Sequence, residues 1–101
     1  MKNRFELAYS PEFLKDFESI NFYIKHELNN IIAADNLLNK VEEKIKERQD
    51  NPLGYEEYKT KANNIYYRIY IGNYVVFYTV NGTTMEIRRI IYGRRNFDKL
   101  I

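Results

Sequence analysis

The apolar residues of this chain follow two kinds of spacing. Residues 4–9 alternate between apolar and polar side chains, which predicts a strand with one buried face. From 13 to 28, and again from 34 to 45, apolar side chains recur every three or four positions and so form a stripe along a helix. Alternation then returns and predicts three further strands, at about 65–71, 74–80 and 84–92.

Residues that start and stop helices stand at the ends of these segments. Ser10 is suited to cap the first helix, and Pro11 fits its first position because that position needs no backbone N–H. The pair Asn29-Asn30 breaks this helix and offers a cap for the second one. Pro52 disfavours helix in the residue before it, so the second helix is expected to stop near Asp50. The short break between the two helices predicts an antiparallel hairpin.

Tight turns join the three C-terminal strands. Gly72-Asn73 separates the first two, and Asn81-Gly82 separates the last two. The second pair is typical of a type I′ turn, which needs positive φ at both positions. Residues 55–64 lack clear periodicity and are expected to be a loop.

The order β-α-α-β-β-β predicts a single α+β domain over residues 1–101. We expect the N-terminal strand and a three-stranded antiparallel meander to form one small sheet, with the helical hairpin packed on one face.

Alternation within the strands assigns side chains to the two faces of this sheet. The set expected to face the helices is Ile65, Tyr67, Ile69, Ile71, Tyr74, Val76, Tyr78 and Val80. Arg68 should then lie on the open face with Tyr66 and Tyr70, and Val75, Phe77 and Thr79 should point the same way. In the last strand Met85, Ile87 and Ile91 favour the core, but the same parity would bury Arg89. A bulge near Arg88-Arg89 would resolve this conflict.

Composition narrows the classes of function. The 101 residues include no cysteine, which excludes disulfides and thiolate metal sites and favours a cytosolic location. The single histidine, His26, is expected on the surface and argues against a zinc site and most histidine-based catalysis. No cofactor or metal is therefore expected. The N-terminus has no signal-like apolar run, and no window approaches the length of a membrane span, so we expect a soluble, unexported protein.

Positive charge and tyrosine are prominent in the C-terminal half. Residues 1–57 carry 8 basic and 12 acidic side chains, a net charge of −4, whereas residues 58–101 carry 8 and 2, a net charge of +6. The chain has 10 tyrosines, which suit half-buried sheet faces and interfaces. Arginine suits phosphate and carboxylate groups. The combination predicts docking of an anionic partner, either nucleic acid or an acidic protein segment; a solvated face with surplus arginine is the plain alternative.

Several features in this order resemble the RelE/ParE superfamily of bacterial toxins. They are the Ser10-Pro11-Glu12 helix start, the hairpin closing at Asn51-Pro52, and the segments YYRIYIGNYVVFY and IIYGRRNFDKL. The resemblance covers essentially the whole chain. It implies the toxin of a type II toxin–antitoxin module, acting in the bacterial cytoplasm in growth inhibition or plasmid stabilisation and neutralised by a cognate antitoxin. It leaves open whether the free toxin is a monomer or a dimer, and it implies a higher-order complex with the antitoxin.

Two mechanisms exist in this superfamily: RelE-like members cleave mRNA in the ribosomal A site, and ParE-like members poison DNA gyrase. By position, Arg68 matches a basic residue of the RelE-like active face, and Arg95 matches an arginine after the last strand. With Tyr92 they are the candidate catalytic residues of that mechanism. Val75 replaces an arginine found in many members, while the Gly93-Arg94-Arg95 motif and the long hairpin are closer to ParE.

The chemistry of these side chains favours binding over catalysis. Arginine, with a pKa above about 12, is a poor base, and Glu86 is the one carboxylate in the predicted C-terminal strands. The sequence therefore predicts inhibition of DNA gyrase by protein binding, with ribosome-dependent mRNA cleavage as the alternative, and leaves open whether the protein is an enzyme. The residues predicted to bind the target or the antitoxin are Arg68, Tyr70, Arg88, Arg89, Tyr92, Arg94, Arg95 and Phe97.

Overall fold

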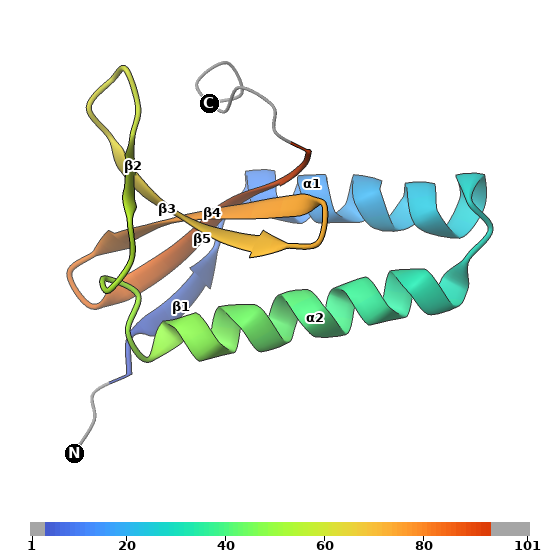
Figure 1. Ribbon diagram of the computed structural model, residues 1–101, viewed down its shortest axis with the longest axis horizontal. Helices are drawn as coiled ribbons and strands as arrows, with labels where there is room; N and C mark the ends of the chain where they lie inside the picture. The colour runs from blue at the N-terminus through green and yellow to red at the C-terminus, as the bar shows by residue number, and fades with distance from the viewer. Residues whose placement is uncertain (1–3, 94–101) are drawn as a thin grey trace.

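A computed structural model describes residues 4–93, which form a helical hairpin and one sheet (Figure 1). The elements are β1 (Glu6–Tyr9), α1 (Pro11–Phe22), the π-helical η1 (Tyr23–Glu27), α2 (Ile31–Gln49), β2 (Glu57–Lys59), β3 (Ile65–Ile71), β4 (Tyr74–Asn81) and β5 (Thr84–Tyr92). The sheet has the order β1-β5-β4-β3-β2; β1 is parallel to β5 and the other pairs are antiparallel. The predicted α+β class and the joining of the N-terminal strand to the meander are confirmed.

The helical hairpin begins and breaks where the sequence predicts. The Ser10 hydroxyl accepts a hydrogen bond from the Phe13 N–H at 3.1 Å, and Pro11 is the first residue of α1. After η1, Asn29 has φ of 49°, a left-handed conformation that ends the helix. The Asn30 side chain then caps α2 by accepting from the Ala33 N–H at 3.0 Å. Within residues 4–93, no helix has both the length and the apolar composition of a membrane span.

The sheet contains one strand more than predicted. Residues 55–64 were expected to be a loop, but Glu57–Lys59 form β2 and pair with β3 at the sheet edge. This part of the prediction is wrong because β2 has only three residues, two of them charged, and too short an alternation to stand out. Asn63, with φ of 66°, lies in the turn that brings the chain back into β3.

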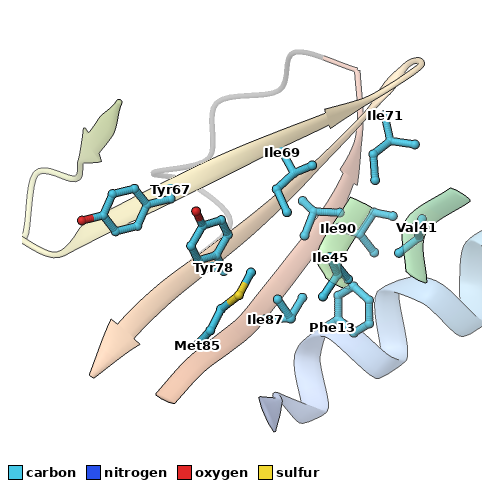
Figure 2. Close-up of a cluster of buried hydrophobic side chains, with 11 residues drawn as sticks. Phe13, Val41, Ile45, Tyr67, Ile69, Ile71, Tyr78, Met85, Ile87 and Ile90 are labelled. Atoms are coloured by element: carbon cyan, nitrogen blue, oxygen red, sulfur yellow. The ribbon is translucent and has the colours of Figure 1, made fainter. Parts of the chain in front are cut away.

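The main core lies between the sheet and the helical hairpin. Figure 2 shows side chains of β3, β4 and β5 pointing toward Phe13 of α1 and toward Val41 and Ile45 of α2. The core contains the predicted inward residues of β3 and β4, with Tyr74 and Val80 at its margin, which confirms their face. Ile65 is the exception and is exposed. Its partner is Lys59 in the short edge strand β2, so it lies at the margin of the sheet.

A bulge in β5 changes which isoleucine enters the core. Phe77 pairs with Arg89 and Tyr78 pairs with Ile87, so Arg88 is the extra residue, as predicted. Ile90 therefore faces the helices. Ile91, predicted for the core, instead joins a second buried cluster on the outer face, with Tyr66, Val75 and Phe77. The expectation that this face is open at Tyr66 is wrong, because Tyr66 is buried.

The hairpin between β4 and β5 also departs from its prediction. Asn81 pairs with Thr84, so the turn is centred on Gly82-Thr83. Gly82 has φ of 58°, whereas Asn81 does not have a positive φ. The type I′ turn expected at Asn81-Gly82 is therefore wrong, and a glycine at the first central position suffices for this turn.

Candidate functional site

The outer side of β3 carries the predicted Arg68 within a group of aromatic residues. Its guanidinium carbon lies 4.9 Å from the ring centroid of Tyr58 and 5.9 Å from that of Tyr70. Its Nη2 forms an ion pair with Glu56 at 2.9 Å, and the Glu56 side chain is mostly exposed. Exposed ion pairs contribute little stability, so a carboxylate from a partner can replace Glu56 at small cost. We call Arg68, Tyr58, Tyr70 and Glu56 the β3 face.

A second arginine fixes the backbone beneath the β3 face. Arg48, near the end of α2, donates from Nη1 to the Arg68 carbonyl at 3.1 Å and to the Tyr78 hydroxyl at 3.0 Å. The Tyr78 hydroxyl in turn donates to the Pro52 carbonyl at 2.8 Å. The ring of Tyr55 lies over the Arg48 guanidinium, 3.4 Å from its central carbon. These contacts tie α2 and the segment after it to β3.

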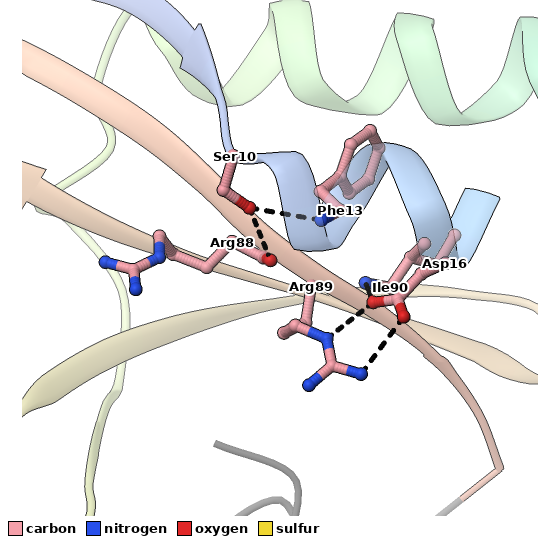
Figure 3. A network of polar contacts seen from close by, with 6 residues as sticks. All are labelled: Ser10, Phe13, Asp16, Arg88, Arg89 and Ile90. Carbon is pink, nitrogen blue, oxygen red and sulfur yellow. Dashed lines mark hydrogen bonds and ion pairs between the residues drawn. The ribbon is translucent and has the colours of Figure 1, made fainter. Parts of the chain in front are cut away.

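Arg88 and Arg89 are adjacent in sequence but their side chains diverge (Figure 3). Arg89 forms two hydrogen bonds with Asp16 of α1, from Nε at 2.6 Å and from Nη2 at 3.0 Å. The same carboxylate accepts from the Ile90 N–H at 3.2 Å. These bonds raise the pKa of Arg89 above its ordinary value. Arg88 instead pairs with Glu86 at 3.2 Å.

Tyr92 lies on the helix side of the sheet, away from the β3 face. It pairs with Tyr74 across the strands, with the rings edge to face and their centroids 5.2 Å apart. Both line an open groove of about 540 Å³ between β5 and the helical hairpin, together with Tyr23 and Leu28. The structure thus separates Tyr92 from Arg68 and Tyr70. Arg94, Arg95 and Phe97 lie outside the described residues.

The histidine and the tyrosines with shifted pKa values lie away from the β3 face. His26 lies on the hairpin and stacks on Phe22, with ring centroids 4.3 Å apart. Burial raises the pKa of Tyr67, Tyr74 and Tyr78, which makes these phenols weaker acids than free tyrosine. Across residues 4–93, no group of three His, Cys, Asp or Glu side chains is placed to hold a metal ion. The arrangement suits recognition of an anionic group.

Three residues around the site were not found from the sequence. Asp16 and Arg48 lie on helices among many other charged residues, and nothing in their spacing marks them as partners of the sheet. Tyr58 lies in the segment expected to be a loop. The only local sign of a strand is that Tyr58 lies between two charged residues, and this pattern is common on protein surfaces.

Stability is expected to fall as the pH rises above about 10. Tyr67, Tyr74 and Tyr78 have pKa values above the ordinary 10.0, chiefly because burial disfavours the phenolate. Unfolding restores the ordinary value, so their contribution is complete below about pH 10 and is lost as the pH rises through the raised values. Urea unfolding at about pH 8 and about pH 11 measures this loss. Equal midpoints would contradict it.

The fold is that of a small α+β protein with an arginine and two tyrosines grouped on the outer side of β3. A family model described as "ParE toxin of type II toxin-antitoxin system, parDE" matches residues 7–97. The chain belongs to this family, and its resemblance to the RelE/ParE superfamily is confirmed.

One sequence relative and two solved structures are similar to this chain over most of its length. Toxin RelE3 of Methanocaldococcus jannaschii is 28% identical over 93 residues, which are 92% of this chain and 96% of the relative. A solved structure titled "Chromosomal ParDE TA system from P. aeruginosa" has a TM-score of 0.75 at 14% identity and covers 90% of this chain and 98% of its own. A conserved hypothetical protein of Helicobacter pylori has a TM-score of 0.54 at 20% identity, with coverages of 87% and 93%. At these identities the structural likeness shows the fold alone.

Proposed function

We propose that this ParE-family toxin inhibits DNA gyrase by binding to it, and that a cognate antitoxin neutralises it. The observation that carries the proposal is the β3 face, where Arg68 lies between Tyr58 and Tyr70 with one exposed carboxylate, Glu56, beside it. Arginine and tyrosine are the residue types that most often anchor protein interfaces. A protein target needs this shaped surface and no proton transfer.

Antitoxin binding is supported by the family to which the chain belongs and by the charge of the surface. Arg68 and Arg88 each form an ion pair with a carboxylate of the same chain, Glu56 and Glu86 respectively. An acidic partner offers carboxylates in their place. Acidic segments that are disordered alone fold on such surfaces, which lets one partner cover a large area.

Ribosome-dependent cleavage of mRNA is the alternative function. One observation favours it: the relative named Toxin RelE3 aligns with 92% of this chain at 28% identity. In that mechanism Arg68 stabilises negative charge on the phosphate, with Arg95 and Tyr92 as further candidates. Tyr92 and Arg68, however, lie on opposite faces of the sheet. A common active site for these two residues therefore requires a rearrangement.

The purified protein should be assayed side by side for inhibition of gyrase supercoiling and for cleavage of ribosome-bound mRNA. We expect the protein to inhibit supercoiling. Arg68→Glu should weaken this inhibition about tenfold or more, because Arg68 is the proposed anchor of the interface and glutamate reverses its charge. Lys15→Glu is the matched control; it makes the same charge change on α1, away from the β3 face, and should leave inhibition unchanged. Codon-phased mRNA cleavage without supercoiling inhibition would overturn the proposal.

A further inference from the structure

One short segment connects the two arginines that meet at β3. Residues 53–56 lie between α2 and β2, and all four are exposed. The ring of Tyr55 lies over the guanidinium of Arg48, with its centroid 3.4 Å from the guanidinium carbon. The next residue, Glu56, forms an ion pair with Arg68 at 2.9 Å. The segment therefore places one side chain on each arginine.

The two contacts of this segment depend on each other. Both of its ends are fixed, because Pro52 is buried and Glu57 begins β2 and pairs with β3. Tyr55 and Glu56 share a peptide bond, so the stack on Arg48 limits where the Glu56 carboxylate can go. The Glu56 side chain is 84% exposed, and an exposed glutamate loses conformational entropy when it holds one ion pair. The stack on Arg48 reduces this loss, since it fixes the neighbouring residue.

The Glu56 carboxylate occupies a position on Arg68 that a target would use. The Arg68 side chain is only 24% exposed, with the rings of Tyr58 and Tyr70 beside its guanidinium and Glu56 on Nη2. A target carboxylate that binds this guanidinium must therefore displace Glu56. A ligand tethered to the same chain competes at a high effective concentration. The measured affinity for the target then falls in proportion to the fraction of molecules in which the site is open.

We propose that Glu56 is an internal competitor at the β3 face, held on Arg68 by the stacking of Tyr55 on Arg48. Its carboxylate stands in for a carboxylate of the target, and binding exchanges one for the other. This inference rests on the proposed function, because it takes gyrase as the target, and it adds a regulation of the same site. An isolated anion gains little from such an exchange. The competitor therefore selects a partner that makes further contacts, for example with the exposed ring of Tyr70.

Glu56→Gln and Tyr55→Ala test the competition in the supercoiling assay. Each should lower the toxin concentration that gives half-maximal inhibition by about two- to fivefold, the range expected for an exposed ion pair or cation–π contact. If Tyr55 acts by holding Glu56, the two effects do not add, and the double variant should match Glu56→Gln alone. Leu53→Ala truncates another exposed side chain of the same segment. It is the matched control and should leave inhibition unchanged.

The reaction of Arg68 with phenylglyoxal in the free toxin, followed by mass spectrometry, measures the cover without any target. Arg68 should react about two- to fivefold faster in both variants. Arg88, which pairs with its own carboxylate Glu86, should keep its wild-type rate and serves as the internal control.

An unchanged rate at Arg68 in Glu56→Gln would overturn the inference, and so would inhibition that weakens or stays the same in that variant. Additive effects of the two substitutions would overturn the role given to Tyr55. A wild-type toxin that does not inhibit gyrase would reject the proposed function itself. The phenylglyoxal rates would still decide whether Glu56 covers Arg68, because they are measured on the toxin alone.

Discussion

Asp16→Ala is expected to lower the free energy of unfolding by about 3 kcal/mol. One carboxylate serves two groups that are shielded from water, the Arg89 guanidinium and the Ile90 N–H. The side chains of Asp16 and Arg89 are only 17% and 19% exposed, so solvent replaces the lost bonds poorly. The pair also fastens α1 to β5 where β1 ends, because β1 pairs with β5 only as far as Ile87.

Urea unfolding of Asp16→Ala beside Asp35→Ala measures this effect. Asp35 is an exposed carboxylate on α2, and its removal should change stability by about 0.5 kcal/mol or less. A double-mutant cycle with Arg89→Ala separates the ion pair from the bond to Ile90, since only the ion pair is shared by the two single variants. The pKa of Arg89 is raised, so its guanidinium stays charged well above neutral pH, and the loss should be the same at about pH 7 and about pH 9. A loss below about 1 kcal/mol would show that α1 is held by its apolar contacts alone.

Tyr78→Phe is expected to cost about 2 kcal/mol. The Tyr78 side chain is fully buried, and its hydroxyl both donates to the Pro52 carbonyl and accepts from Arg48. Phenylalanine fills nearly the same volume, so the cost isolates the two hydrogen bonds. The substitution leaves the buried Pro52 carbonyl without its donor. An unpaired buried acceptor costs more than the net contribution of the hydrogen bond itself.

The comparison that checks this is Tyr70→Phe, which removes a hydroxyl from a side chain that is 61% exposed and should leave stability nearly unchanged. Both variants can be measured by urea unfolding at neutral pH. Because the Tyr78 hydroxyl also holds Arg48, exchange of amides in the segment after α2 should speed up in Tyr78→Phe. Equal stability of the two variants would mean that water replaces the lost partners, contrary to the burial seen here.

The sequence predicts the helical hairpin well because its limits depend on neighbouring residues. Ser10 and Asn30 cap the first turn of their own helices, and no distant contact is needed to recognise them. The bulge in β5 is predicted for a different reason: strict alternation would have buried Arg89 among apolar residues. β2 is missed because its three residues pair only after β3 is in place.

The candidate site is predicted less completely than the fold. Arg68 and Tyr70 share a face because alternation in one strand fixes it. Alternation cannot show that Arg89 forms an ion pair with Asp16. The two residues are far apart in sequence, and many other acidic residues of the chain could equally be the partner. The bulge at Arg88 shifts the rest of β5 by one face, and this places Tyr92 on the helix side. Adjacent arginines in a sequence therefore do not guarantee a common surface.

The position of β1 in the sheet limits how early the protein can fold during its own synthesis. β1 is at residues 6–9, yet its partner is β5, at residues 84–87. The first strand of the nascent chain consequently waits without a partner until almost the whole polypeptide has left the exit tunnel. Translation that stops before β5 leaves β1 without the strand that joins it to the rest of the sheet, so a truncated chain cannot complete this fold.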